Sequence, residues 1–235
     1  MTERPILFSG EMVRAILDGR KTQTRRKMKV QPPPDARVTV EHYTSIVTDR
    51  RYGDMKPGKK VFGALWDGGE CGLPCPYGQP GDHLWVRESG AWRDGVVAFA
   101  ATDLVLPLGQ KWKPSIHMPR WASRITLRIT DIRVERLQDI SEEDARAEGA
   151  RRFDDLPSMH PYGQDARWSM DVPTTTDQCL GTARFSFAHF WNSINGPGAW
   201  EANPWVWAIS FEDARHLCKG IGGIARAALE GKGDE

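Results

Sequence analysis

The sequence predicts an α+β fold in which a few helices pack on a small mixed β-barrel. The segment from Ser123 to Val134 alternates apolar and polar side chains, a pattern typical of a half-buried strand. Stretches with helical spacing are few and short, and long connections rich in proline and glycine separate the elements. Strands and helices do not alternate regularly, which disfavours a doubly wound parallel sheet.

The first helix is expected to begin after Ser9 and to end before Gly19. Ser9 is a suitable N-cap, and Glu11 complements the positive end of the helix dipole. Gly19 suits the position just past the helix, where a left-handed backbone is common. One apolar stripe at helical spacing is formed by Met12, Val13, Ile16 and Leu17.

Further strands are predicted over 83–87, 96–101 and 205–211. The first two are expected to pair as a hairpin, with residues 89–95 as the turn. A short helix is predicted over 141–148, because Ser141 and Asp144 have capping-box spacing and Gly149 can end the helix. A longer helix is predicted over 183–194, with one apolar face made by Phe187, Phe190, Trp191 and Ile194.

The elements are expected to form a single domain over residues 1–212. Insertions are expected near 27–78, 102–122 and 151–181, where proline, glycine and polar residues gather. The first of them is predicted to hold loops and short strands rather than a separate domain. Residues 213–235 are expected to be a C-terminal tail, helical at first and then flexible.

The charge balance argues against a protein that coats nucleic acid by bulk charge. The 235 residues include 32 Lys+Arg and 31 Asp+Glu, for a formal net charge of +1. A local basic site is still allowed. No stretch approaches the about 18 apolar residues of a membrane helix, and the N-terminus lacks a signal-peptide pattern. We therefore expect a cytoplasmic protein with no membrane partner.

The cysteines are expected to be reduced in that compartment. Cys71 and Cys75 have the spacing of half a zinc site, but no second half follows. A glycine- and proline-rich loop with two thiols is the favoured interpretation. We expect no metal and no organic cofactor. The remaining two cysteines are Cys179 and Cys218.

The most informative stretch is "GRKTQTRR" at 19–26, which follows the first helix. By spacing alone, basic residues there favour a solvated C-terminal turn, and a threonine there is usually a local hydrogen-bonder. The stretch also fits the pattern G-x-K-x-x-[E/T]-x-R. The matching positions are Gly19, Lys21, Thr24 and Arg26.

Three later segments complete a resemblance to ASCH domains, which have a PUA-like β-barrel. They are "QPGDHLWV" at 79–86, "SRITLRITDIRVERLQDISEEDARAEG" at 123–149 and "NPWVWAISF" at 203–211. The whole chain also resembles proteins of tailed phages and prophages that have such a core. For a phage-encoded protein, the expected location is the host cytoplasm.

Many ASCH domains have glutamate where this chain has Thr24. Threonine is the form seen in small bacterial N4-acetylcytidine amidohydrolases. The resemblance to that branch implies a catalytic set of Lys21, Thr24 and a glutamate on the short helix after the central strand. Alignment of that helix without gaps puts the glutamate at Glu148, with Glu142 and Glu143 as alternatives.

The chemistry suits these residue types, because amide cleavage needs a nucleophile, a base and an acid. Thr24 offers a hydroxyl. Lys21 can be its base if burial or a neighbouring cation lowers its pKa below about 10.4. The candidate neighbours are Arg20, Arg25 and Arg26. Glu148 would supply the proton for the leaving amine near the C-terminal end of its helix.

Aromatic and basic residues alternate in "KWKPSIHMPRWASR" at 111–124, a mixture that suits a stacked base and a phosphate or ribose contact. For Trp85, Trp205 and Trp207, which lie on predicted strands, core packing is favoured over stacking. The residues expected to bind substrate are Arg20, Arg26, Trp112, His117 and Trp121.

Two functions follow from these patterns. The first is an amidohydrolase that removes an acyl group from a modified nucleoside or base. The alternative is a non-catalytic module of a phage that binds RNA, DNA or a modified base. A weaker third reading is a phage assembly or anti-defence factor that uses the barrel as a scaffold. The expected partner is a modified nucleoside or nucleic acid, and nothing in the sequence indicates an oligomeric state.

Overall fold

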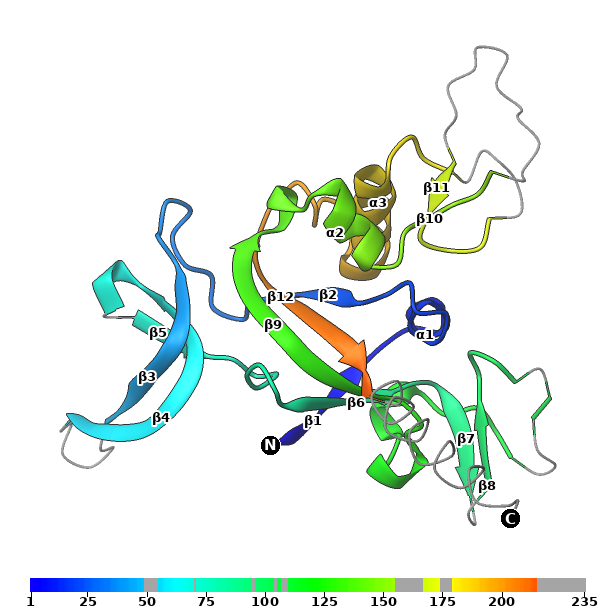
Figure 1. Ribbon diagram of the computed structural model, residues 1–235, viewed down its shortest axis with the longest axis horizontal. Coiled ribbons are helices and arrows are strands. Elements are labelled where there is room, and N and C mark those ends of the chain that lie inside the picture. Colours follow the sequence, from blue (N-terminus) through cyan, green and yellow to red (C-terminus); the bar gives the residue numbers. More distant parts are fainter. Residues whose placement is uncertain are drawn as a thin grey trace, which may run out of the picture. The chain divides into compact units, whose positions relative to one another are not determined.

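The computed structural model describes residues 1–48, 55–69, 71–93, 96–103, 105–106, 110–154, 167–173 and 179–214. The chain has a strand-rich α+β arrangement with few helices (Figure 1). It forms two compact units. The first contains Met1–Gly19, Gly81–Thr130 and the residues from Phe211 on. The second contains Arg20–Pro80 and Asp131–Ser210.

The first unit contains a sheet in the order β1-β6-β9. Strand β1 (Glu3–Leu7) pairs in parallel with β6 (His83–Arg87), and β6 pairs antiparallel with the start of β9 (Thr126–Arg136). Helix α1 (Gly10–Leu17) begins at Ser9, whose Oγ accepts the Met12 N–H at 3.4 Å. Gly19 follows the helix with φ +73°, so the predicted helix and both of its ends are confirmed.

The predicted hairpin between 83–87 and 96–101 is wrong. Strand β8 (Val96–Phe99) pairs with β7 (Gly90–Arg93), which lies in the segment expected to be the turn. Two features hold β7 in place. A Cβ at Gly90 would meet the Ala98 oxygen at 2.6 Å, so only glycine fits this close pairing, and Trp92 packs against Met118 and Ala122. The segment 110–122 contains two short 3₁₀ turns, Ser115–His117 and Arg120–Ala122.

The second unit contains the strand order β9-β12-β2. Strand β2 (Gln23–Lys27) pairs antiparallel with β12 (Trp205–Asp213), and the paired positions include Thr24 and Ile209. A turn at Leu137–Asp139 joins β9 to helix α2 (Glu142–Ala147), which packs beside α3 (Ala183–Asn195), as Figure 1 shows. Their shared core includes Leu137, Ile140, Phe187, Trp191 and Val206.

Both predicted helices of this unit are confirmed. Thr182 caps α3 by accepting the Phe185 N–H at 3.1 Å. On the predicted apolar face of α3, Phe187, Phe190 and Trp191 are buried, whereas Ile194 is exposed. Two short strands, β10 (Arg151–Arg152) and β11 (Trp168–Ser169), pair with each other.

The segment expected to hold loops and short strands instead forms a substantial three-stranded sheet. It consists of β3 (Thr39–Thr48), β4 (Met55–Trp66) and β5 (Cys71–Pro74), with a turn at Asp67–Gly69 before β5. Figure 1 shows β3 and β4 as a long curved pair. Many side chains on these strands are exposed, so the apolar alternation that identifies strands in a sequence is weak here.

The described strands form no closed barrel, and β1 and β2 are the end strands of the longest strand order. The single domain over 1–212 stays a prediction. Residues 215–235 of the expected tail lie outside the described residues, as do 155–166 and 174–178 of the third expected insertion. None of the described helices has the length and apolar character needed to span a membrane.

Candidate functional site

The end of α2 docks on the start of β2 and thereby positions Glu148. Helix α2 begins at Ser141, whose Oγ accepts the Asp144 N–H at 3.0 Å. It ends sharply at Gly149, which has φ +113°; the Gly149 N–H donates to the Arg146 oxygen, and the next N–H donates to Ala145. The Thr22 N–H donates to the Ala147 oxygen at 2.8 Å, so Glu148 lies beside β2.

Lys21 and Glu148 form a buried pair. The Lys21 Nζ lies 2.6 Å from Glu148 Oε2 and donates to the Glu148 backbone oxygen at 2.8 Å. Each of the two residues is only 2% exposed. Burial lowers the pKa of Lys21; Glu148 opposes this effect, and Arg26 and Arg25 add to it. The pair therefore has the burial and the neighbouring charges that adapt a lysine to proton transfer.

Thr24 is buried on the strand that follows Lys21. It is 1% exposed and faces Ile209 across the β2–β12 pairing. Because side chains of a strand alternate between faces, Thr24 and Arg26 share one face of β2, and Gln23 and Arg25 share the other. The structure thus brings Lys21 and Glu148 into direct contact and keeps Thr24 on the adjoining strand of the same unit.

Arg26 has Tyr77 and Glu148 as electrostatic partners. Burial lowers the pKa of Arg26, and Tyr77 and Glu148 oppose that effect. Burial raises the pKa of Tyr77, and Arg26 opposes that rise. Tyr77 follows β5 in the "CPYGQPGD" loop, and sequence reasoning missed it. The signal that could have identified Tyr77 is its position just before the segment at 79–86 that resembles ASCH domains.

Arg25 lies on the opposite face of β2 and is also buried, with a fully covered side chain. Its Nε and Nη2 donate to Glu135 Oε1 at 2.9 and 2.6 Å. Its Nη2 also lies 3.1 Å from Asp144 Oδ2. Its Nη1 donates to Gln23 Oε1 at 2.6 Å and to Glu148 Oε1 at 3.3 Å. Glu148 is therefore contacted by Lys21 through one oxygen and by Arg25 through the other.

The neighbouring glutamates on α2 have other roles. Glu142 accepts the N–H groups of Ala183 and Arg184 at 3.0 and 3.3 Å, so it caps the start of α3. Glu143 is exposed. Of the three candidate acids, Glu148 is the one whose carboxylate contacts Lys21.

The other predicted substrate-binding residues are distributed over both units. Arg20 is half-buried in the second unit, where its Nη1 donates to the Gly149 oxygen at 2.9 Å and so holds the end of α2. Trp112, His117 and Trp121 belong to the first unit and are exposed, the tryptophans by 42% and 59%. The contacts between Lys21 and Glu148 do not involve these three residues.

The cysteine pair has unequal surroundings, since Cys71 is exposed and Cys75 is buried. Within the described ranges, no group of three or more His, Cys, Asp or Glu side chains is arranged to hold a metal ion.

Comparison of the chain with protein-family models, with curated proteins and with solved structures finds no match. The support for a function therefore comes from the geometry of the Lys21–Glu148 pair and from the motif that contains Lys21. A buried amine in contact with a carboxylate, close along the chain to a buried hydroxyl, contains the three groups that amide hydrolysis needs.

Proposed function

We propose that this protein is an amidohydrolase that removes an acyl group from a modified nucleoside or base of the N4-acetylcytidine type. The observation that carries the proposal is the buried contact of 2.6 Å between Lys21 Nζ and Glu148 Oε2. A catalytic role explains why the chain accepts the desolvation cost of two charged groups, which buried pairs often fail to recover. The motif around Lys21 supplies the substrate class, by its resemblance to that of the amidohydrolases.

The proposed reaction begins with one proton shared by Lys21 and Glu148. When the proton is on Oε2, Nζ is a neutral amine and removes the proton of Thr24 Oγ1 as this oxygen bonds to the acyl carbon. The tetrahedral intermediate collapses, the C–N bond breaks, and the departing amine takes the proton from Glu148. An acyl-threonine ester, a lysine ammonium and a glutamate carboxylate result.

Water completes the cycle. The Glu148 carboxylate removes a proton from water as the water oxygen bonds to the acyl carbon. The ester C–O bond breaks, the carboxylic acid leaves, and Thr24 Oγ1 recovers a proton from the Lys21 ammonium. Atoms and charges then return to the starting state without any external cofactor.

Arg26 and Tyr77 are proposed to bind the base. Arg26 shares the Thr24 face of β2 and has Tyr77 as an electrostatic partner. A guanidinium donates to carbonyl oxygens such as that of a pyrimidine, and a phenol ring offers a face for stacking. The finer fold assignment, an ASCH-like member of the PUA-like group of phage type acting in the cytoplasm, is part of the same proposal.

Chromatography of N-acylated nucleosides after incubation with the protein tests this function. We expect the wild type to release free nucleoside and carboxylic acid, and Lys21→Met and Glu148→Gln to lose about 10²-fold or more of the rate. Lys27→Met is the matched control, because Lys27 is an exposed lysine at the end of β2, the strand that follows Lys21. A panel with no turnover by the wild type would contradict the proposal.

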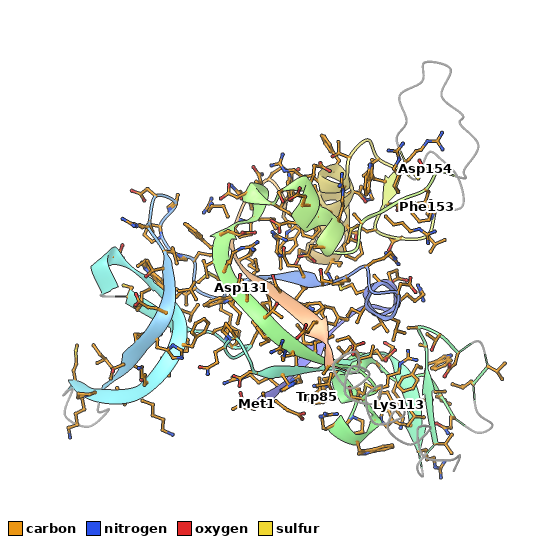
Figure 2. All side chains as sticks on the ribbon, viewed as in Figure 1. Met1, Trp85, Lys113, Asp131, Phe153 and Asp154 are labelled. Carbon is orange, nitrogen blue, oxygen red and sulfur yellow. The ribbon has the colours of Figure 1, made fainter. Side chains whose placement is uncertain are left out.

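One observation favours the second candidate function, binding of single-stranded nucleic acid. In the first unit, Trp112 and Trp121 are exposed, and the guanidinium groups of Arg87 and Arg120 lie 5.5 and 5.9 Å from the ring of Trp85, a residue labelled in Figure 2. The exposed rings suit base stacking and the arginines suit phosphate contacts, and both belong to the first unit.

Oligonucleotide binding as a function of salt tests the second candidate. A binder of several phosphates loses affinity steeply as salt rises, and Trp121→Ala should weaken it further. Phe185→Ala serves as control, because Phe185 is an exposed ring of the second unit. An affinity that changes neither with salt nor in Trp121→Ala would exclude this function.

A further inference from the structure

Arg25 has no direct part in the reaction proposed above, yet its guanidinium group contacts several side chains of the second unit. Its side chain is completely covered and lies 6.0 Å from the ring of Phe187. Its guanidinium nitrogens reach four acceptor side chains: Gln23, Glu135, Asp144 and Glu148. An arginine in this state is fixed in orientation, because any rotation would break several charge-assisted hydrogen bonds at once.

The fixed guanidinium is tied to the sheet as well as to α2. Gln23, which accepts from Arg25 Nη1 at 2.6 Å, itself donates to Ser210 Oγ on β12 at 3.1 Å. Asp144 comes from α2 and Glu135 from β9. Arg25 is therefore anchored to β9 and α2 directly, and to β12 through Gln23. It also contacts one group of the proposed site, the Glu148 carboxylate.

Glu148 is held from two directions. Lys21 takes Oε2 at 2.6 Å, and Arg25 takes Oε1 at 3.3 Å. With Oε1 occupied, rotation of the carboxylate about its terminal bond is restricted, so Oε2 stays directed at Nζ. The positive charge of Arg25 also opposes protonation of Lys21.

We propose that Arg25 is a positioning residue that fixes the Glu148 carboxylate so that its other oxygen can exchange a proton with Lys21. The inference rests on the proposed function for its meaning in catalysis. The predicted effect on the Lys21–Glu148 pair itself is independent of any substrate.

Arg133 provides a matched control. It approaches the same two outer carboxylates, with Nη2 at 3.4 Å from Asp144 and Nε at 3.6 Å from Glu135. It is 43% exposed, and Glu148 is absent from its ion pairs in the described part of the chain. Arg133→Gln therefore disturbs the outer carboxylates and leaves the Glu148 carboxylate in place.

The first experiment titrates Lys21 directly. Lysine labelled with ¹³C at Cε reports the protonation of each amine by NMR, and the Lys21 signal is the one missing in Lys21→Met. We expect the pKa of Lys21 to rise in Arg25→Gln, because a repelling cation is lost and Glu148 becomes free to serve Lys21 alone. In Arg133→Gln the titration should match that of the wild type.

Arg25→Lys separates charge from geometry and covers the case in which Arg25→Gln does not fold. A lysine keeps the cation but cannot reach four acceptors with one ammonium group. We expect kcat to fall by about 10- to 100-fold with KM within about twofold, while the thermal midpoint of Arg25→Lys is used to confirm folding.

The two proposals fail in different ways. A wild type that hydrolyses no acylated nucleoside contradicts the function, and the Lys21 titration still decides the role of Arg25. In an active wild type, a Lys21 titration that is the same in a folded Arg25→Gln variant overturns the positioning role, and so does an unchanged kcat in a folded Arg25→Lys variant. A fall in kcat in Arg133→Gln equal to that in Arg25→Lys also overturns it, because the effect would then come from the outer carboxylates.

Discussion

At the scale of single residues, the second unit buries a lysine and a glutamate in direct contact. Burial favours the neutral form of the lysine, and mutual contact and hydrogen bonds offset the loss of water around the two groups. The two Glu148 acceptors for Lys21, one carboxylate oxygen and the backbone oxygen, provide that compensation. The stability of this region therefore depends on keeping the pair intact.

Lys21→Met is expected to destabilise the protein by about 3–5 kcal/mol, because it leaves the Glu148 carboxylate buried without its nearest cation. The double variant Lys21→Met/Glu148→Gln should lose less than the sum of the two single variants, since contacting residues are coupled. Urea unfolding measures all of them. Lys27→Met should stay within about 0.5 kcal/mol of the wild type, and additive single effects would show that the contact contributes nothing.

The pH dependence of the rate follows from the direction of the Lys21 shift. Below the lowered pKa of Lys21, its side chain is an ammonium and cannot act as a base. We expect kcat/KM to rise with pH through that lowered pKa, below the range of an ordinary lysine. In Arg25→Lys, which retains the cation, the rise of kcat/KM with pH should still occur in the lowered pH range. A profile that rises only where free lysines titrate would contradict Lys21 as the base.

At the scale of elements, α2 acts as a short support that delivers Glu148 to β2. Both of its ends are specified locally, by the Ser141 cap and by the positive φ of Gly149. The helix has only six residues, so its stability depends on these ends and on packing against α3 more than on its own hydrogen bonds.

Ser141→Ala and Gly149→Ala should each cost about 1 kcal/mol in stability and also lower kcat, because both loosen the segment that holds Glu148. Ser9→Ala is the matched control: it removes the equivalent cap of α1 in the first unit. Thermal unfolding and steady-state kinetics of the three variants check the prediction. Equal effects on kcat from Ser9→Ala and Ser141→Ala would contradict a specific role of α2 in holding Glu148.

At the scale of the whole molecule, acid should unfold the protein partly through Asp144. Burial acts most strongly on the pKa of Asp144 and raises it, but Arg25, Arg133 and the hydrogen bonds from Gln23 and Ser141 together lower it. A lowered folded pKa stabilises the protein above the unfolded value of about 3.9, and that contribution is lost as pH falls through the folded pKa.

Asp144→Asn should therefore lower stability at neutral pH and flatten the loss of stability between about pH 5 and pH 2. Asp131→Asn is the control, because Asp131 on β9, labelled in Figure 2, is 54% exposed with Arg133 3.9 Å away. Urea midpoints over this pH range decide the question. An unchanged slope in Asp144→Asn would show that Asp144 does not contribute to acid sensitivity.

Elements with local signals could be predicted from the amino-acid sequence. Caps, glycines and apolar periodicity predicted α1, α2 and α3, alternation predicted β9, and strand-like composition predicted β6 and β12, all confirmed by the structure. Lys21 and Thr24 were predicted as site residues through the motif that they share. These features are set by a few neighbouring residues, so they are visible without knowing what packs against them.

The pairing of elements and the contacts between distant side chains became visible in the folded chain. The parallel β1–β6 pair, the β7–β8 hairpin and the long β3–β4 pair depend on distant partners, and the exposed faces of β3 and β4 hide their periodicity. The docking of α2 on β2 distinguishes the two candidate glutamates, because it brings Glu148, and not Glu142, into contact with Lys21. Arg25 and Tyr77 gained their roles because contacts between residues far apart in sequence, not spacing along the chain, set their burial and charge environment.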